Sequence, residues 1–357
     1  MKIKINHKEY SSKYFLQPEN EIDFENENPI GKQLFVFLNS WFSDSKFLEI
    51  KTSGSTGKPK VFLVEKWKLE ASVKRTLDFF DLNKESTFLL CLPISFIAGK
   101  LMVIRSMLNN GNLITQTPSS SPLSNLKIPI DFGAITPMQM LGSIESVGIE
   151  NIAQIKFLLI GGASVSDSLI TQLEGFKGKV FETFGMTETL THFALRECYP
   201  IKQKAFKLLP EISMQAIDGK LTVKSNSFLQ EVISTNDIVE ITNNNQFIWK
   251  GRADFTINSG GIKVQPESIE NKLLETTIPT PFYISFKPDE KLGQKMVLCV
   301  LQGNSKIIKD ANFRNLEKIE KPKAIVEVDE FPLAENGKIL RNQLAKKIEN
   351  LLEWSIG

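Results

Sequence analysis

Residues 51–60 read KTSGSTGKPK, which is the clearest chemical signal in the sequence. Glycine lets a backbone approach a ligand closely, while hydroxyls, amides and lysine offer donors and positive charge to phosphoryl oxygens. The nucleotide-binding P-loop needs four residues between its glycines, followed by Lys and then Ser or Thr. Here Gly54 and Gly57 enclose only two residues, and Lys58 is followed by Pro59. Taken alone, the stretch is therefore either a phosphate cradle of another kind or a solvated polar turn.

The scarcity of histidine and cysteine limits the chemistry that the chain can perform. Only two histidines are present, His7 and His192, so a multi-histidine metal site is excluded and a catalytic triad has essentially one candidate base. Three cysteines (Cys91, Cys198, Cys299) lie far apart and form neither a metal-ligand pattern nor a disulfide framework, which favours a reducing compartment. We expect catalysis by lysine, carboxylates, hydroxyls and backbone amides.

The composition is typical of a soluble globular protein. Of 357 residues, 41% are hydrophobic and 24% are charged, and the net charge of +2 predicts no nucleic-acid partner. The opening residues lack the apolar run of a signal peptide. The longest uncharged apolar stretch, 87–99, is about half of what a membrane-spanning helix needs. The sequence therefore predicts a cytoplasmic protein without stable membrane insertion and specifies no oligomeric state.

Strand-like apolar runs alternate with helical patterns over the first 205 residues or so, which predicts an α/β fold with a mainly parallel sheet. The predicted strands are 47–54, 61–66, 87–93, 112–117, 131–137, 155–163 and 179–185.

Beyond about residue 205, apolar runs separated by polar turns predict an antiparallel β section. A smaller α+β part is expected from about residue 255, with helices near 266–275 and 336–353. We predict an N-terminal domain over 1–250, a hinge at 251–254 and a C-terminal domain over 255–357.

Six segments, in order, resemble signatures of the acyl-adenylate-forming (AMP-binding) enzymes, the superfamily of acyl-CoA synthetases and nonribosomal peptide adenylation domains. The segments are KTSGSTGKPK (51–60), LIGGASV (159–165), ETFGMTET (182–189), STND (234–237), GRADFTINSGGIKVQPESIE (251–270) and PLAENGKILR (332–341). Six ordered matches are far more specific than one, so the resemblance favours the phosphate cradle over the plain turn. It implies an acyl-CoA synthetase-like fold with a small mobile C-terminal domain.

The resemblance also implies roles for residues that would bind Mg·ATP. The loop would grip the β- and γ-phosphates through Thr52, Ser53, Gly54, Ser55, Thr56, Gly57 and Lys60. The adenine would meet Gly161, Gly162 and Ala163 at the end of a strand, together with Phe184 and Gly185, and Phe184 would stack on its face. Thr187 would contact a phosphate, and Glu188 would hold Mg²⁺ through a carboxylate oxygen.

The later segments would complete the catalytic machinery. Asp237 would accept hydrogen bonds from the ribose hydroxyls with help from Arg252, and Asp254 would serve as the hinge of a domain rotation. Lys338 would bridge the carboxylate nucleophile and the α-phosphate, where negative charge accumulates. The catalytic residues implied are thus Lys338, Thr187 and Glu188.

The implied reaction has two steps and uses ATP, Mg²⁺ and coenzyme A. A carboxylate attacks the α-phosphorus of ATP to give an acyl adenylate and pyrophosphate. A thiol then displaces AMP and forms a thioester.

The small-molecule acid is suggested by a further resemblance, to the o-succinylbenzoate–CoA ligase branch of menaquinone biosynthesis. GMTET (185–189), LPISFIAGKLM (92–102) and the short chain before the phosphate loop are similar to that branch, with Phe96 where a histidine can stand. A second carboxylate on the acid would need a cation, for which Lys100 is the first candidate and Arg105 and Arg196 the next. Thr191 and His192 could line the same pocket.

Several alternatives stay open. Lys100 could be an ordinary solvated lysine on a helix, the acid could be a different acyl or aryl acid, and the thiol could belong to a carrier protein. A non-catalytic nucleotide-binding relative is also conceivable, although the presence of Lys338, Glu188 and Asp237 argues against it.

Overall fold

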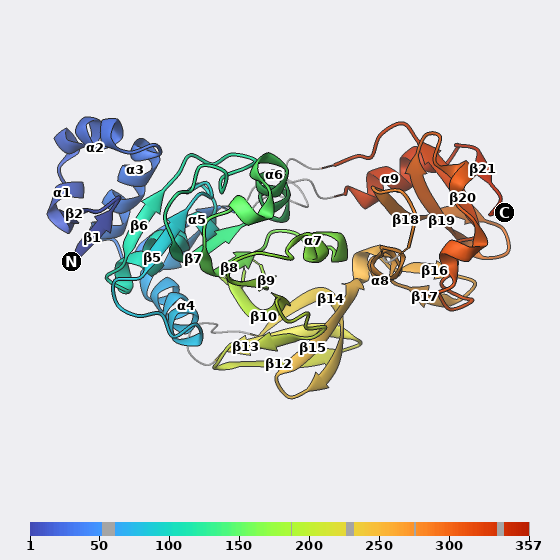
Figure 1. Cartoon of the computed structure of the whole chain (residues 1–357). Coiled ribbons are helices and arrows are strands. Elements are labelled where there is room, and N and C mark those ends of the chain that lie inside the picture. Colours follow the sequence, from blue (N-terminus) through green and yellow to red (C-terminus); the bar gives the residue numbers. More distant parts are fainter. Residues whose placement is uncertain (52–60, 187, 226–231, 275, 334–338, 357) are drawn as a thin grey trace. The chain divides into compact units, whose positions relative to one another are not determined.

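The computed structural model of the chain describes residues 1–51, 61–186, 188–225, 232–274, 276–333 and 339–356 (Figure 1). Its contacts divide the chain into two compact units. The first comprises Met1–Val165, Leu169–Met214 and Val223–Ile233, and the second Ser166–Ser168, Gln215–Thr222 and Ser234–Gly357. The predicted α/β class is confirmed, as described below for each unit. The predicted hinge at 251–254 lies within the second unit and stays a prediction, because it concerns motion.

Five parallel strands form the centre of the first unit, in the spatial order β9-β8-β7-β5-β6. The strands are β5 (Thr87–Leu90), β6 (Asn112–Thr115), β7 (Ile130–Ile135), β8 (Ile155–Ile160) and β9 (Lys179–Gly185). Each lies within a predicted strand, except that β7 begins one residue before its predicted range of 131–137. The connections carry the helices α4 (Lys66–Phe79), α5 (Ile97–Leu108), α6 (Pro137–Val147) and α7 (Asp167–Gln172). Because the strands are parallel, their carboxyl ends meet at one edge, where open α/β sheets bind ligands.

Local sequence explains how helix α6 begins directly after β7. Thr136 accepts a hydrogen bond from the backbone N–H of Gln139 at 3.2 Å, and the Gln139 side chain accepts one from the Thr136 N–H at 3.1 Å. This capping box satisfies two of the free amides at the helix start, and Pro137 suits the first helical position.

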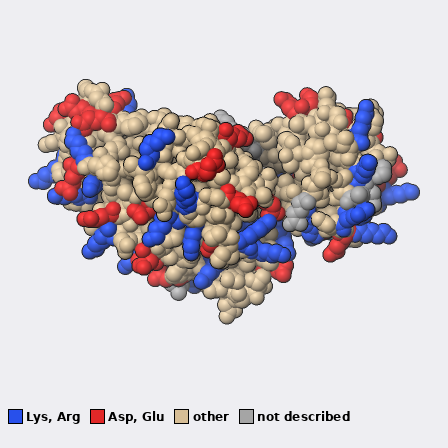
Figure 2. All heavy atoms as spheres, viewed as in Figure 1, with Lys and Arg blue, Asp and Glu red and all other residues tan. Residues whose placement is uncertain are grey.

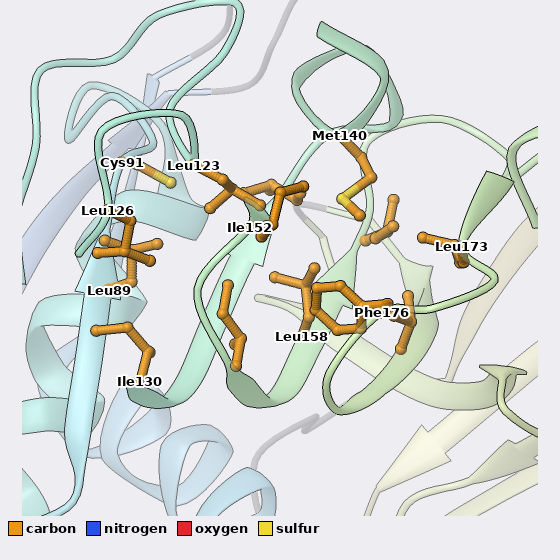
Figure 3. Packing of buried hydrophobic residues seen from close by; sticks show 14 of the residues in the cluster. Leu89, Cys91, Leu123, Leu126, Ile130, Met140, Ile152, Leu158, Leu173 and Phe176 are labelled. Atoms are coloured by element: carbon orange, nitrogen blue, oxygen red, sulfur yellow. The ribbon is translucent and has the colours of Figure 1, made fainter. Parts of the chain in front are cut away.

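The buried core beside these strands is mainly aliphatic, with Phe176 among its residues (Figure 3). Leu89, Ile130 and Leu158 from β5, β7 and β8 belong to one cluster with Met140 of α6, and all four are almost completely buried. The loop residues Leu123, Leu126 and Ile152 complete the packing. This burial holds the strand ends, and therefore the loops that follow them, in fixed positions.

Further strands extend the sheet on both sides. Strand β10 (His192–Tyr199) pairs with β9, and β11 (Phe206–Leu208) pairs with β10. On the other side β1 (Lys2–Ile5) runs parallel to β6, and β2 (Lys8–Ser11) is antiparallel to β1. The chain between β2 and β3 forms α1 (Ser12–Phe15), α2 (Glu21–Glu27) and α3 (Gly31–Phe42), around an aromatic cluster in which the Phe15 and Phe24 rings lie 5.2 Å apart. The sequence predicted no elements before residue 47.

Strands β3 (Phe47–Lys51) and β4 (Val61–Glu65) flank the predicted phosphate loop. They pair antiparallel as a separate two-stranded sheet, with Lys51 opposite Val61. Both strands were predicted, but as part of the alternating α/β pattern. A short connection favours antiparallel pairing, because parallel strands need a crossover of a dozen or more residues.

The antiparallel section predicted after residue 205 is confirmed. It contains β12 (Ile212–Ile217) and β13 (Lys220–Ser225), which fall at the division between the units, and β14 (Ile233–Asn243) and β15 (Gln246–Arg252) of the second unit. Strands β14 and β15 form an antiparallel hairpin in which Asp237 lies opposite Arg252.

The remainder of the second unit is a small α+β fold, as predicted. Its strands are β16 (Ile257–Ser259), β17 (Ile262–Val264), β18 (Phe282–Asp289), β19 (Gly293–Leu301), β20 (Ala324–Val328) and β21 (Glu353–Trp354). Along β19, Leu298 packs with helix α8 (Pro266–Leu273), while Val297 and Cys299 pack with helix α9 (Arg341–Ile348). Such alternation is what a strand covered on both faces requires.

Helix α9 is shorter than the predicted 336–353. It begins at Arg341, because Leu333 and Ile339 form a β-bridge and the Leu340 N–H bonds to the Pro332 carbonyl at 2.8 Å. After the helix, residues 353–354 pair with β20 instead. Short 3₁₀ helices occupy Pro18–Asn20, Ile149–Asn151, Ala253–Phe255, Ser305–Ile307 and Asp310–Phe313.

The visible face carries both signs of charge in a mixed arrangement (Figure 2), which fits the net charge of +2. No helix in the described part of the chain is long and apolar enough to cross a membrane.

Candidate functional site

The glycines at 161–162 follow strand β8 at the carboxyl edge of the parallel sheet. A side chain at Gly161 would come within 2.2 Å of the Thr183 Oγ1 on β9, and Gly162 has a φ of +85°, which favours glycine. The Gly161 N–H donates to the Ile135 carbonyl at 3.1 Å. This close approach puts a backbone segment, rather than side chains, at the predicted adenine surface, with Ala163 half-buried beside it.

Phe184, the predicted adenine-stacking residue, stands near the end of β9 and is half-buried. Its ring centroid lies 5.6 Å from that of Phe193 and 5.1 Å from that of Phe206. A side chain at Gly185 would meet the Thr191 carbonyl at 2.4 Å and the His192 Cα at 2.5 Å. A glycine is therefore needed at position 185, where β10 starts next to β9. The rings of Phe193 and Phe206 hold the Phe184 ring in place.

Glu188 lies in the turn after β9 and is exposed, while Thr187 lies outside the described residues. An exposed carboxylate at this edge fits Mg²⁺, which takes few protein ligands and binds phosphate oxygens and water for the rest. No group of three acidic, histidine or cysteine side chains suited to a metal exists among the described residues. In its predicted role, Glu188 would contribute one ligand to Mg²⁺, with the nucleotide supplying others.

His192 begins β10 and is buried. Its Nε2 lies 3.4 Å from the Thr76 Oγ1 and its Nδ1 lies 3.2 Å from the Thr191 Oγ1. Burial, together with the positive charges of Arg105 and Arg75, holds the pKa of His192 well below its usual range. The ring is therefore neutral at pH 7 and acts as a hydrogen-bonding group, with one nitrogen donating and the other accepting.

Two buried arginines lie close to this histidine, Arg75 on α4 and Arg105 on α5. Arg105 is 3% exposed, and its guanidinium carbon lies 5.8 Å from the Phe132 ring centroid. Its Nε has no hydrogen-bond partner in the described part of the chain, and neither do the buried hydroxyls of Ser72 and Ser106. Burial lowers the pKa of Arg105 to about 10, which still leaves it charged at pH 7. Arg75 was not predicted from the sequence, although an arginine between the apolar positions of an amphipathic helix is a visible signal.

The other two predicted cations of the acid pocket are engaged elsewhere. The Lys100 Nζ donates to the Glu49 carbonyl of β3 at 2.6 Å, so it connects α5 to the hairpin that flanks the phosphate loop. The Arg196 Nε donates to the Glu182 Oε2 at 2.6 Å. Phe96 caps the start of α5 and is 45% exposed.

In the second unit, Asp237 on β14 is half-buried. The Trp249 Nε1 donates to its Oδ1 at 3.0 Å, and its own N–H donates to the Thr235 Oγ1 at 3.0 Å. Burial raises its pKa, and the Trp249 hydrogen bond opposes that shift. The hydrogen bond from the Trp249 indole to Oδ1 fixes the orientation of the Asp237 carboxylate.

Arg252, across the hairpin from Asp237, forms an ion pair with Asp254, in which Nη2 and Oδ2 lie 2.7 Å apart. The predicted hinge residue Asp254 belongs to the 3₁₀ turn Ala253–Phe255 that follows β15. The predicted residues Thr52, Ser53, Gly54, Ser55, Thr56, Gly57, Lys60 and Lys338 lie outside the described residues.

Comparison with known proteins places this geometry in a family. A model described as AMP-binding enzyme matches residues 48–220. An acyl-CoA synthetase (AMP-forming)/AMP-acid ligase II-like protein from Dyadobacter fermentans DSM 18053 is 30% identical, and the match covers 90% of this chain and 95% of that chain with a TM-score of 0.59. The chain belongs to the AMP-binding enzyme family.

Two further relatives have lower sequence identity to the chain. The 2-succinylbenzoate–CoA ligase of Lactococcus lactis subsp. lactis is 24% identical over 333 residues, covering 87% of this chain and 73% of that protein. The o-succinylbenzoate coenzyme A synthetase MenE from Bacillus subtilis, in complex with ATP and magnesium ion, shares the fold at 18% identity. Its TM-score is 0.70, over 83% of this chain and 69% of that one. The predicted resemblance to acyl-CoA synthetases is confirmed, and the roles of the individual residues stay predictions.

Proposed function

We propose that the chain is an ATP-dependent acid–CoA ligase whose acid is 2-succinylbenzoate. Curated 2-succinylbenzoate–CoA ligases from Lactococcus lactis and Listeria monocytogenes are each 24% identical to it over 87% of its length. The reaction would proceed through an acyl adenylate, with AMP as the leaving group in thioester formation. AMP is what makes the carboxylate reactive, because a free carboxylate resists attack by a thiol.

The chain's own residues would act mainly by placement and electrostatics. The loop at 51–60 would hold the departing pyrophosphate, Phe184 and the 161–163 segment would hold the adenine, and Asp237 the ribose. Glu188 would bind Mg²⁺, which neutralises phosphate charge when bound. Lys338 would stabilise the charge that develops around the α-phosphorus.

The observation that carries the choice of acid is the buried cation Arg105. A guanidinium removed from water costs free energy unless a charge or several hydrogen bonds compensate it. Among the described residues no carboxylate forms an ion pair with Arg105, and its Nε has no hydrogen-bond partner. A second carboxylate on the substrate would supply the missing charge, and the hydroxyls of Ser72 and Ser106 would be further donors.

Neutral His192 suits the same acid. A positive charge on its ring would be unfavourable near Arg75 and Arg105, whereas a neutral imidazole can hydrogen-bond to a carboxylate or ketone oxygen. Thr191 fixes one ring nitrogen from the adjacent position. Of the three cations predicted for the pocket, Arg105 is therefore the one we assign to the substrate.

The proposal is tested by incubating the full chain with Mg·ATP, coenzyme A and a panel of acids while monitoring pyrophosphate and thioester. We expect release of both with 2-succinylbenzoate, and much less with 4-oxo-4-phenylbutanoate, which lacks the ring carboxylate. Pyrophosphate release with a different acid, and none with 2-succinylbenzoate, would overturn the proposed substrate and leave the proposed mechanism in place. Release of pyrophosphate without thioester would indicate a carrier-bound thiol as the acceptor.

A further inference from the structure

The charged pair Glu182–Arg196 lies beside the predicted adenine surface rather than in the acid pocket. Glu182 is on β9, two residues before Phe184, and its side chain is 6% exposed. Arg196 lies opposite Glu182 on β10, and both its Nε and its Nη2 contact the Glu182 Oε2, at 2.6 and 2.5 Å. The pair thus connects two neighbouring strands by a short, largely buried ion pair.

The second oxygen of Glu182 is used in a different way. The backbone N–H of Val165 donates to the Glu182 Oε1 at 3.2 Å. Val165 ends the segment that begins with Gly161 and Gly162, and it is buried. One carboxylate therefore binds Arg196 with one oxygen and fixes the glycine segment with the other.

A second contact leads from Arg196 to Phe184. The guanidinium carbon of Arg196 lies 4.9 Å from the centroid of the Phe206 ring, a cation–π distance. Phe206 in turn packs against Phe184, with ring centroids 5.1 Å apart. The pair and the two rings lie on β9, β10 and β11, three consecutive strands of the sheet.

We propose that Arg196 is a positioning residue for the nucleotide, holding the 161–165 segment through Glu182 and Phe184 through Phe206. The spacing between these two surfaces decides whether an adenine ring fits between them. The loss of the pair would therefore weaken the binding of the base and leave the binding of phosphates unaffected. The proposal rests on the proposed function only in taking ATP as the nucleotide.

The test is calorimetric titration of the full chain with Mg·ATP and, separately, with Mg·tripolyphosphate, which lacks the base. For Arg196→Met we expect the Kd for ATP to rise at least tenfold and the Kd for tripolyphosphate to stay within twofold. Glu182→Gln retains an acceptor for the Val165 N–H, so we expect a smaller rise of about threefold to tenfold. Arg196→Lys preserves the charge and should recover most of the affinity.

The double variant shows whether Arg196 acts through Glu182. If it does, Arg196→Met combined with Glu182→Gln binds ATP no more weakly than Arg196→Met alone, because the two changes interrupt one connection. If the rises in Kd for ATP of the two single variants multiply in the double variant, Arg196 does not act through Glu182. The matched control is Asp131→Asn, a carboxylate that accepts from the Thr87 N–H at 2.8 Å near the start of β7, away from the carboxyl edge.

The outcomes separate this proposal from the proposed function. Wild-type protein that binds no Mg·ATP would overturn the proposed function itself. Wild-type protein that binds Mg·ATP, with Arg196→Met binding it equally well, would overturn only the positioning role. Equal weakening toward ATP and tripolyphosphate would also overturn it, as would an equal effect of Asp131→Asn. If Arg196→Met does not fold, Glu182→Gln carries the same comparison between ATP and tripolyphosphate, with Arg196→Lys as the charge-preserving reference.

Discussion

At the scale of single residues, the charge of Arg105 is expected to determine which acids the pocket accepts. A hydrogen bond to a charged group contributes about 1.5–3 kcal/mol, which corresponds to a factor of roughly 10 to 150 in affinity. We therefore predict that Arg105→Met raises the KM for 2-succinylbenzoate by at least tenfold. The same change should affect 4-oxo-4-phenylbutanoate little, because that acid has no ring carboxylate.

Initial rates of pyrophosphate release with each acid provide the measurement. Lys100→Met is the matched control, because the Lys100 Nζ already donates to the Glu49 carbonyl. It should leave the preference between the two acids unchanged. A preference that follows Lys100 instead of Arg105 would contradict the assignment.

Lys338 carries a prediction that depends on the family resemblance alone. Because its proposed role is confined to the first step, Lys338→Ala should abolish adenylate formation and largely spare thioester formation from acyl adenylate made beforehand. Single-turnover assays of the two half-reactions separate the effects, with exposed Lys346→Ala of α9 as the control. Equal loss in both half-reactions would remove the role.

The sequence predicted these residues unevenly, for physical reasons. Short motifs such as 159–165 and 182–189 keep their chemistry within a few positions, so they could be identified directly. The partner of Arg196 could not, because Glu182 meets it only through the antiparallel register of β9 and β10. Arg75 and Arg105 are brought together by the packing of two helices, which single-sequence periodicity does not specify.

At the scale of elements, the pairing of β9 with β10 at Gly185 is tightly constrained. A side chain there would lie 2.4 Å from the Thr191 carbonyl, and backbone cannot move aside as a flexible side chain can. We predict that Gly185→Ala lowers the free energy of unfolding by about 1–3 kcal/mol, the usual cost of overpacking. It should also weaken ATP binding, because Phe184 is the adjacent residue.

Gly133→Ala is the matched control for this prediction. Gly133 lies on β7 of the same sheet, and a side chain there would meet the Leu158 Cδ1 at 3.4 Å, an ordinary contact. Denaturant unfolding and ATP titration of both variants provide the comparison. A Gly185→Ala protein as stable as Gly133→Ala would show that β10 can shift without loss.

Elements with strong apolar periodicity were predicted well, and those defined by pairing were not. The strands β5, β8 and β9 lie within their predicted ranges and β7 begins one residue before its own, because apolar runs bounded by glycine and polar turns mark buried strands. The pairing of β3 with β4 was not foreseen, since the sequence does not show which strand is a neighbour. The early start predicted for α9 failed for a similar reason, since a β-bridge holds the residue before Leu340.

At the scale of the whole molecule, the residues with predicted roles are divided between the two units. The adenine and acid residues belong to the first unit, whereas Asp237, Arg252 and Asp254 belong to the second. Catalysis by a chain of this kind would depend on both units, so the stability of the second bears on the activity of the whole. That stability is expected to depend on pH through one buried carboxyl group.

Glu267 begins helix α8 beneath the end of β15. Its Oε2 and the Gln265 Oε1 lie 2.7 and 3.1 Å from the point where a side chain on Gly251 would begin. Both oxygens are buried acceptors without a hydrogen-bond partner among the described residues. A proton on Glu267 would remove the negative charge from this buried oxygen.

The charges around Glu267 act in both directions, but burial dominates. Burial raises the pKa of Glu267 to about 7, the Arg341 guanidinium opposes the rise, and the neighbouring Glu270 adds to it. Arg341 itself is bound mainly by Glu270, whose Oε2 accepts from its Nη2 at 2.6 Å, and Arg252 is the other cation nearby. The folded protein therefore retains a proton that the unfolded chain releases near pH 4.5.

The sign of the pH effect follows from this difference. Between pH 4.5 and about 7 the folded state holds more protons than the unfolded state, so the free energy of unfolding falls as the pH rises. The contribution of Glu267 is complete below that range and is lost above it, by an amount on the order of 3 kcal/mol at most.

Glu267→Gln removes the titration, so the variant should gain stability relative to wild type between pH 5 and pH 8. Glu270→Gln, which leaves Arg341 with the longer ion pair of 3.4 Å between its Nε and the Glu267 Oε1, should be destabilising at both pH values. Urea unfolding of the three proteins, followed by the fluorescence of Trp249 and Trp354, measures the differences, and equal pH profiles for Glu267→Gln and wild type would rule out the proton on Glu267.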